Sequence, residues 1–191
     1  MRILQLLPEL KLGGVERGTV DLSEHLTKLG HKSAVVSAGG GLTEQLSDHG
    51  AKHFSLPIAK KNFLAIKQYK NLQEIYRKFK PDIIHVRSRF PAWINVLALK
   101  GLSSSKPIII STFPGLYSKP FYSKFMSYAD DIIAISKTVQ DYIFLPAREE
   151  TANISFFFQA EDGIRDRSPS RGLVFCQSQA STVFWLSLIH I

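Results

Sequence analysis

Residues 1–40, MRILQLLPELKLGGVERGTVDLSEHLTKLGHKSAVVSAGG, decide the fold that this sequence predicts. The apolar run 3–7 predicts a buried strand, and apolar side chains at near-helical spacing across 15–29 predict a helix after it. Gly30 ends that helix, and residues 33–37 predict a second strand. The order strand, loop, helix, strand is the repeating unit of α/β proteins.

Two glycines, Gly13 and Gly14, stand where the first loop enters this helix. Glycine lets the backbone approach a ligand closely, and the start of a helix offers unpaired N–H groups and a partial positive charge. Both features suit a phosphate, so the pair predicts a site for a phosphorylated or nucleotide-linked ligand. A tight connection without any ligand explains the pair as well, because it is shorter than a full G-x-G-x-x-G motif.

Strands and helices continue to alternate as far as residue 143. Further strands are predicted at 52–56, 82–86, 108–112 and 132–135, and helices at 43–49, 63–79, 91–99, within 117–128 and at 137–143. This alternation predicts the α/β fold class with a doubly wound, mostly parallel sheet. Such sheets bind ligands beyond the carboxyl ends of their strands, so the site residues are expected there.

Composition narrows the class of protein. The chain is 45% hydrophobic and 21% charged, as globular proteins are. Met1 leads straight into a strand-length apolar run, so we expect no signal peptide, and no run approaches the roughly 18 apolar residues of a membrane span. The single cysteine, Cys176, lies near the C-terminus, which leaves no disulfide scaffold or cysteine-based metal site. We expect a cytoplasmic protein without a metal.

Much of the formal net charge of +8 lies in the segment between Lys60 and Lys80. Apolar residues recur there at three- and four-residue steps, which predicts an amphipathic helix with a basic outer face. A solvated surface helix explains this pattern, and so does attraction to an anionic substrate or to an anionic membrane surface. No nucleic-acid motif accompanies the charge, so no nucleic-acid partner is expected.

Four segments together resemble the N-terminal domain of GT-B glycosyltransferases of family 4. They are GGVERGTVDLSEHLTKLGH at 13–31, PDIIHVRSRFPAW at 81–93, PIIISTFPG at 107–115 and ADDIIAISKTVQDYI at 129–143. The resemblance covers about residues 1–145. It implies a Rossmann-like domain and retaining transfer of a sugar from a nucleotide-sugar donor to a glycan or lipid acceptor. Relatives often act in the assembly of lipopolysaccharide or another cell-envelope glycan at the inner face of the membrane, a setting with which the basic helix is compatible. The nucleotide-sugar is a substrate, and no cofactor is implied.

The resemblance also implies two groups of site residues. Those beside the donor phosphate and the cleft are Gly13, Gly14, Glu16 and Arg17. Those on the acceptor side are His85, Arg87, Ser88, Arg89, Thr112, Phe113, Pro114 and Ser136.

Simpler roles remain open for several of these residues. Glu16 could equally stabilise the start of its helix. The guanidiniums of Arg87 and Arg89 suit bidentate binding of phosphate or carboxylate, but surface ion pairing is the alternative. His85 lies in a predicted strand, where a packed core histidine is more common, and capping suffices to explain Ser136.

One position departs from the pattern of the family. Many relatives carry a histidine of the active site after the strand 108–112, and Pro114 stands at that position here. Proline has no side-chain group that could transfer a proton. The catalytic residue is therefore left unassigned.

The C-terminal stretch has a different character. From Phe156 onwards it shows no clear period and no helix caps. Three pieces resemble translated sequencing-library oligonucleotides: QAEDGIRD at 159–166, SRGL at 170–173 and LSLIHI at 186–191. We expect residues 1–150 to form the acceptor-side domain and residues 151–191 to be a non-native or disordered tail, adapter-like from about 156. A natural irregular tail is the alternative.

No segment of the sequence resembles the donor-binding second domain of the family, with its Glu-x7-Glu motif. We therefore expect a truncated glycosyltransferase that is inactive alone. The competing hypothesis is a non-catalytic α/β module that binds a nucleotide or an anionic surface.

Overall fold

The computed structural model describes residues 1–59, 63–102, 106–116, 123–143 and 153–156. It contains a seven-stranded sheet in the order β3-β2-β1-β4-β5-β6-β7, and every neighbouring pair is parallel. The strands are β1 Arg2–Leu6, β2 Lys32–Ser37, β3 Lys52–Ser55, β4 Ile83–Val86, β5 Ile108–Phe113, β6 Asp131–Ala134 and β7 Asn153–Phe156. The predicted doubly wound, parallel α/β class is confirmed.

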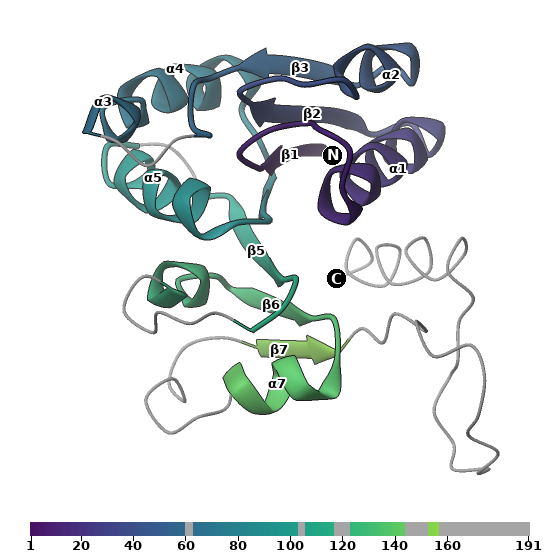
Figure 1. Cartoon of the computed structure of the whole chain (residues 1–191). Coiled ribbons are helices and arrows are strands. Elements are labelled where there is room, and N and C mark those ends of the chain that lie inside the picture. The colour runs from purple at the N-terminus through teal and green to yellow at the C-terminus, as the bar shows by residue number, and fades with distance from the viewer. Residues whose placement is uncertain (60–62, 103–105, 117–122, 144–152, 157–191) are drawn as a thin grey trace, which may run out of the picture.

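Helices cover both sides of this sheet. They are α1 Gly14–Lys28, α2 Thr43–Asp48, α3 Phe63–Ile66, α4 Tyr69–Phe79, α5 Arg89–Leu99, the 3-10 turn η1 Lys124–Ser127 and α7 Lys137–Ile143. Figure 1 shows α1 and α2 on one side and α3, α4 and α5 on the other. None of the described helices is long and apolar enough to cross a membrane.

The central strands are apolar on both faces because each face is covered. On β1, Leu4 belongs to the main hydrophobic cluster together with Leu72 of α4. Its neighbour Ile3 points to the other face and packs with Leu22 and Leu26 of α1. Side chains that alternate along one strand therefore enter two separate cores.

The basic segment forms two helices instead of the single helix expected at 63–79. The break lies at Lys67 and Gln68, between α3 and α4. There the Gln68 N–H donates to the Ala65 carbonyl (3.1 Å) and the Lys70 N–H to the Lys67 carbonyl (3.3 Å). These bonds span three residues instead of four, so the chain tightens into a turn before α4 begins.

Helix α4 keeps the amphipathic character that the sequence predicts. Leu72 and Tyr76 are buried against the sheet, whereas Lys70, Arg77 and Lys78 are exposed. The first basic residues of the segment, at 60 and 61, lie outside the described residues.

Two other elements differ from expectation. Helix α5 begins at Arg89, ahead of the predicted start at Pro91. Pro91 is then the third residue of the helix, where its missing N–H breaks no bond, because the first four N–H groups have no intrahelical partner. The helix expected within 117–128 is the short turn η1, and residues 117–122 lie outside the description.

The last described strand, β7, pairs with β6 at the edge of the sheet. It lies beyond residue 150, where the sequence suggested a domain boundary. The segment 157–191, which holds the adapter-like pieces, is outside the described residues, so the boundary and the tail stay predictions.

Candidate functional site

The point where the strand order reverses lies between β1 and β4. From β1 the chain continues to β2 and β3 on one side, and from β4 it continues to β5 and β6 on the other. Ligands of open α/β sheets bind at such a switch point, beyond the carboxyl ends of the strands. The segments that leave the sheet there are residues 7–13 and residues 87–88, so the glycine pair and Arg87 belong to adjacent strand ends.

The glycine pair opens helix α1. Gly13 is the N-cap residue with an extended backbone (φ −165°), and its carbonyl accepts the first helical bond from the Arg17 N–H (2.9 Å). Both glycines are exposed, and a Cβ at Gly14 would meet no atom within 4 Å. A Cβ at Gly13 would clash with the Glu16 carboxylate. Glycine at position 13 thus leaves room for Glu16, and the helix start is open to solvent.

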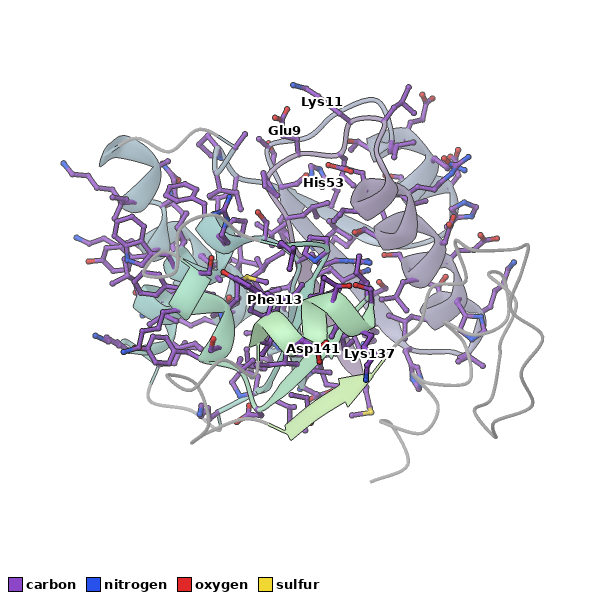
Figure 2. The ribbon with its side chains drawn as sticks, turned by 60° about the horizontal axis from the view of Figure 1, so that its bottom comes forward. Glu9, Lys11, His53, Phe113, Lys137 and Asp141 are labelled. Carbon is purple, nitrogen blue, oxygen red and sulfur yellow. The ribbon has the colours of Figure 1, made fainter. Side chains whose placement is uncertain are left out.

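A second loop supports the glycine loop, which comprises residues 7–13 between β1 and α1. The Leu10 N–H donates to the Gly39 carbonyl (2.9 Å), and the Leu42 N–H donates to the Leu10 carbonyl (3.0 Å). Gly40 has φ +152°, and a Cβ there would clash with the Leu10 backbone. The β2–α2 loop therefore fixes the glycine loop through a contact that only glycine permits. Farther along the glycine loop, Lys11 pairs with Glu9 (2.5 Å) at the rim of the molecule (Figure 2).

Arg87 points at α1 and belongs to a buried polar network. Its Nη1 donates to Gln5 Oε1 and to Thr19 Oγ1, both at 3.1 Å. Gln5 in turn donates from Nε2 to the Thr19 carbonyl (3.0 Å) and to Ser23 Oγ (2.8 Å). Gln5 thereby lies on the α1 face of the sheet, between Ile3 and the loop.

The Arg87 guanidinium has no carboxylate within ion-pair distance among the described residues. Its Nε is buried and without a hydrogen-bond partner in that part of the chain. Burial lowers the pKa of Arg87 to about 10, against the smaller opposing effects of Glu16 and Asp21. The group is still a cation at neutral pH, so the switch point contains a partly buried positive charge near the start of α1.

His85 is a buried core residue of β4. Its Nε2 lies 2.7 Å from Thr112 Oγ1 of β5, and both side chains are buried. Burial, and then the charge of Arg87, hold the pKa of His85 well below its ordinary value. The imidazole is therefore neutral at pH 7 and links two strands within the sheet.

Three further candidate residues, Arg17, Ser88 and Arg89, have neighbours other than the Arg87 network. Arg17 donates from Nη1 to Gln45 Oε1 of α2 (2.7 Å), so it is directed to the β2–α2 side. Ser88 is the N-cap residue of α5 without a side-chain cap bond, and Arg89 is the first residue of that helix. Arg87 and Arg89 therefore belong to different elements, one directed at α1 and the other on α5.

The strand ends nearer the sheet edge supply the last candidates. Phe113, labelled in Figure 2, is fully buried in the main hydrophobic cluster, which also contains Val139 and Ile143 of α7, so its side chain is not open to a ligand. Pro114 is half-buried directly after it. Ser136 accepts a bond on Oγ from the Val139 N–H (3.2 Å), which confirms the predicted cap of α7. No group of three or more potential metal ligands gathers within the described segments.

Comparison with known proteins identifies the family. The model of the family described as Glycosyltransferase Family 4 matches residues 12–145. This chain belongs to glycosyltransferase family 4. A glycosyltransferase from Rickettsia africae is similar, with 32% identity and a TM-score of 0.67 over 80% of this chain and 42% of the other.

Two more distant solved structures share the fold of this family 4 chain. Anabaena HepE in complex with UDP-glucose has 16% identity and a TM-score of 0.63, over 82% of this chain and 43% of the other. The apo form of the lipopolysaccharide outer core galactosyltransferase WaaB has 18% identity and a TM-score of 0.60, over 81% and 44%. The chain thus spans less than half of these relatives. No curated protein matches the sequence significantly.

The family 4 domain contains site residues that sequence reasoning missed. Gln5 and Thr19 bind Arg87, and Gly40 positions the glycine loop. The one available signal was Gln5, a polar residue inside the apolar run of the first strand. Its buried amide requires partners, but the sequence does not say which residues supply them.

Proposed function

We propose that this chain supplies the acceptor-side domain of a retaining glycosyltransferase. The full enzyme would transfer a sugar from a nucleotide-sugar donor to a glycan or lipid acceptor, with no cofactor or metal. The observation that carries this proposal is the pairing of an open helix start at Gly13 and Gly14 with the cation of Arg87, whose Nε is buried without a hydrogen-bond partner among the described residues. Unpaired N–H groups and a positive charge together suit the diphosphate of such a donor.

Relatives support the classes of donor and acceptor. The Anabaena structure contains UDP-glucose, and WaaB is named for transfer of galactose to the lipopolysaccharide outer core. A further neighbour in fold is MurG of Acinetobacter baumannii. We accordingly propose a uridine-diphosphate sugar as donor and a cell-envelope glycan or lipid as acceptor.

The polypeptide 1–191 is proposed to be inactive alone. Sugar transfer needs the reactants held in a closed cleft and the charge of the leaving diphosphate neutralised. We propose that the loops after β1 and β4 form only one wall of such a cleft. Measurable sugar transfer or donor hydrolysis by the purified polypeptide would contradict this part of the proposal.

Titration with UDP tests the site itself. We expect UDP to bind weakly and uridine, which lacks phosphate, to show no binding at the same concentrations. Arg87→Gln should weaken UDP binding about tenfold, as expected for a charge-assisted contact of about 1.4 kcal/mol. Lys28→Gln is the matched control, because Lys28 is an exposed cation at the far end of α1 that already pairs with Glu24. Equal effects of the two substitutions, or equal affinity for UDP and uridine, would refute the site.

The nature of the tail needs a test at the level of DNA. We propose that residues from about 156 derive from library oligonucleotides and that the natural reading frame continues differently. Sequencing the source DNA across the codons for Asp141 to Gln159 decides this. A frame that continues into a second α/β domain supports the proposal. Genomic DNA that encodes QAEDGIRD and stops after Ile191 would overturn it.

A membrane partner is proposed for the basic face of α4. Each exposed cation near an anionic surface contributes about 1 kcal/mol, so a few cations suffice for peripheral binding at the inner membrane face of the cytoplasm. The variant with Lys70→Glu, Arg77→Glu and Lys78→Glu should lose salt-sensitive binding to phosphatidylserine vesicles. Lys28→Glu, at the end of α1 on the other side of the sheet, is the control and should retain it.

Three outcomes separate the alternatives for this surface. Equal loss in the α4 variant and the control would refute the proposed face. Binding of duplex DNA that the α4 substitutions abolish would contradict the expectation of no nucleic-acid partner. Vesicle binding without any UDP binding would favour a non-catalytic module over the glycosyltransferase domain.

A further inference from the structure

Glu16 occupies an unusual place for a carboxylate beside a phosphate site. It is the third residue of α1, and its Oε2 folds back against Gly13 at the helix start. Among the described residues the Glu16 side chain makes no hydrogen bond and no ion pair. No hydrogen bond or ion pair within the described residues therefore fixes this carboxylate at the point where an anion is expected to bind.

Arg87 lies on the same face of α1 as Glu16. Thr19, which accepts the bond from Arg87 Nη1, is three residues after Glu16, and residues three apart are neighbours on a helix face. Arg87 Nη2 lies 3.3 Å from the position that a Cβ of Gly18 would take, against the second turn of the helix. The Arg87 side chain is partly buried, and its Nε is buried without a hydrogen-bond partner among the described residues.

The Glu16 carboxylate thus lies near two positive features, the open end of α1 and the partly buried Arg87 guanidinium one turn further along the helix. The charge of Glu16 also raises the pKa of Arg87, which agrees with a favourable interaction across this short distance. A diphosphate would be attracted by the same two features. Two anions close together repel each other, so the carboxylate and the phosphate cannot both occupy this place at low cost.

We propose that the Glu16 carboxylate is an internal counter-ion of the anion site, and that a diphosphate must displace it in order to bind. This inference rests on the proposed function of the glycine loop as a phosphate site. Glu16 would then set the affinity for the donor diphosphate and prevent tight capture of free inorganic anions. The simpler role, an acidic residue that stabilises the helix start, predicts an effect on stability and none on phosphate affinity.

Titration of UDP and of inorganic pyrophosphate into the full chain at low salt tests the proposal. Glu16→Gln keeps the size of the side chain and removes its charge, so both ligands should bind roughly 3- to 10-fold more tightly. Asp21→Asn is the matched control. Asp21 also raises the pKa of Arg87 and is exposed on the same helix, but it does not lie against Gly13. Its substitution should change both affinities less than twofold.

Each outcome decides between the alternatives. Unchanged or weaker binding by Glu16→Gln, while the wild type binds UDP, refutes the counter-ion role and leaves the phosphate site intact. Equal gains from Glu16→Gln and Asp21→Asn refute it as well, because the effect would then come from net charge. Absence of UDP and pyrophosphate binding in every variant refutes the proposed function, and this inference with it. A uridine titration checks that the gain acts on the phosphates, since an equal gain for uridine also refutes the proposal.

Discussion

The contact between the two loops beside the switch point is open to a direct test at Gly40. Its φ of +152° is a conformation that side-chain-bearing residues rarely adopt, and forcing it costs about 1–3 kcal/mol. A methyl group there would also clash with the Leu10 backbone, which cannot rotate away. Relief requires the loops to separate, and each of the bonds from Leu10 to Gly39 and from Leu42 to Leu10 contributes about 0.5–1.5 kcal/mol.

Gly40→Ala should therefore lower the free energy of unfolding by roughly 2–6 kcal/mol, a large share of the roughly 5–15 kcal/mol of a typical domain. Gly41→Ala is the matched control, because a Cβ there meets no atom within 4 Å and the backbone is not left-handed. Urea unfolding followed by circular dichroism at 222 nm measures both variants. A difference of less than about 0.5 kcal/mol, within the usual range for neutral surface substitutions, would show that the loops separate freely and would refute the reasoning.

Three further predictions concern the core and the helix caps. The pKa of His85 in the folded chain lies well below 6.5, the ordinary value for a histidine, so below pH 6.5 the unfolded chain binds a proton there that the folded chain excludes. The free energy of unfolding should therefore decrease as the pH is lowered. One proton changes the free energy of unfolding by at most about 1.4 kcal/mol per pH unit. Urea midpoints measured between pH 7.5 and 5.5 should show this dependence, and His85→Gln should reduce it. Tyr76→Phe removes the buried bond to Asn95 Oδ1 (2.6 Å) and should cost about 1–3 kcal/mol, partly recovered by adding Asn95→Leu; no recovery in the double variant would contradict this account. Ser136→Ala should lower the free energy of thermal unfolding by about 1 kcal/mol. Ser88→Ala should lower it clearly less, because the Ser88 side chain makes no cap bond. Equal losses would contradict the capping role of Ser136.

Local patterns predicted the elements well where one periodicity dominates. The apolar run at β1 and the helical spacing of α1 gave their positions within a residue or two. The prediction failed at Lys67 and Gln68, where apolar spacing continues through a turn that backbone bonds create. It was also incomplete at α5, since Ser88 reads as a loop residue until the extended backbone before Arg89 is known.

The sequence by itself determined the alternation of strands and helices, the burial of both sheet faces, and the glycines at the start of α1. These features depend on residues close together in the chain, so periodicity and backbone preference suffice to reveal them. Only the tertiary structure decided that β1 lies beside β4 and brings Gln5 to Arg87, 82 residues away. The same is true of the contact between Gly40 and Leu10. Strand order sets these partners, and strand order depends on how whole elements pack.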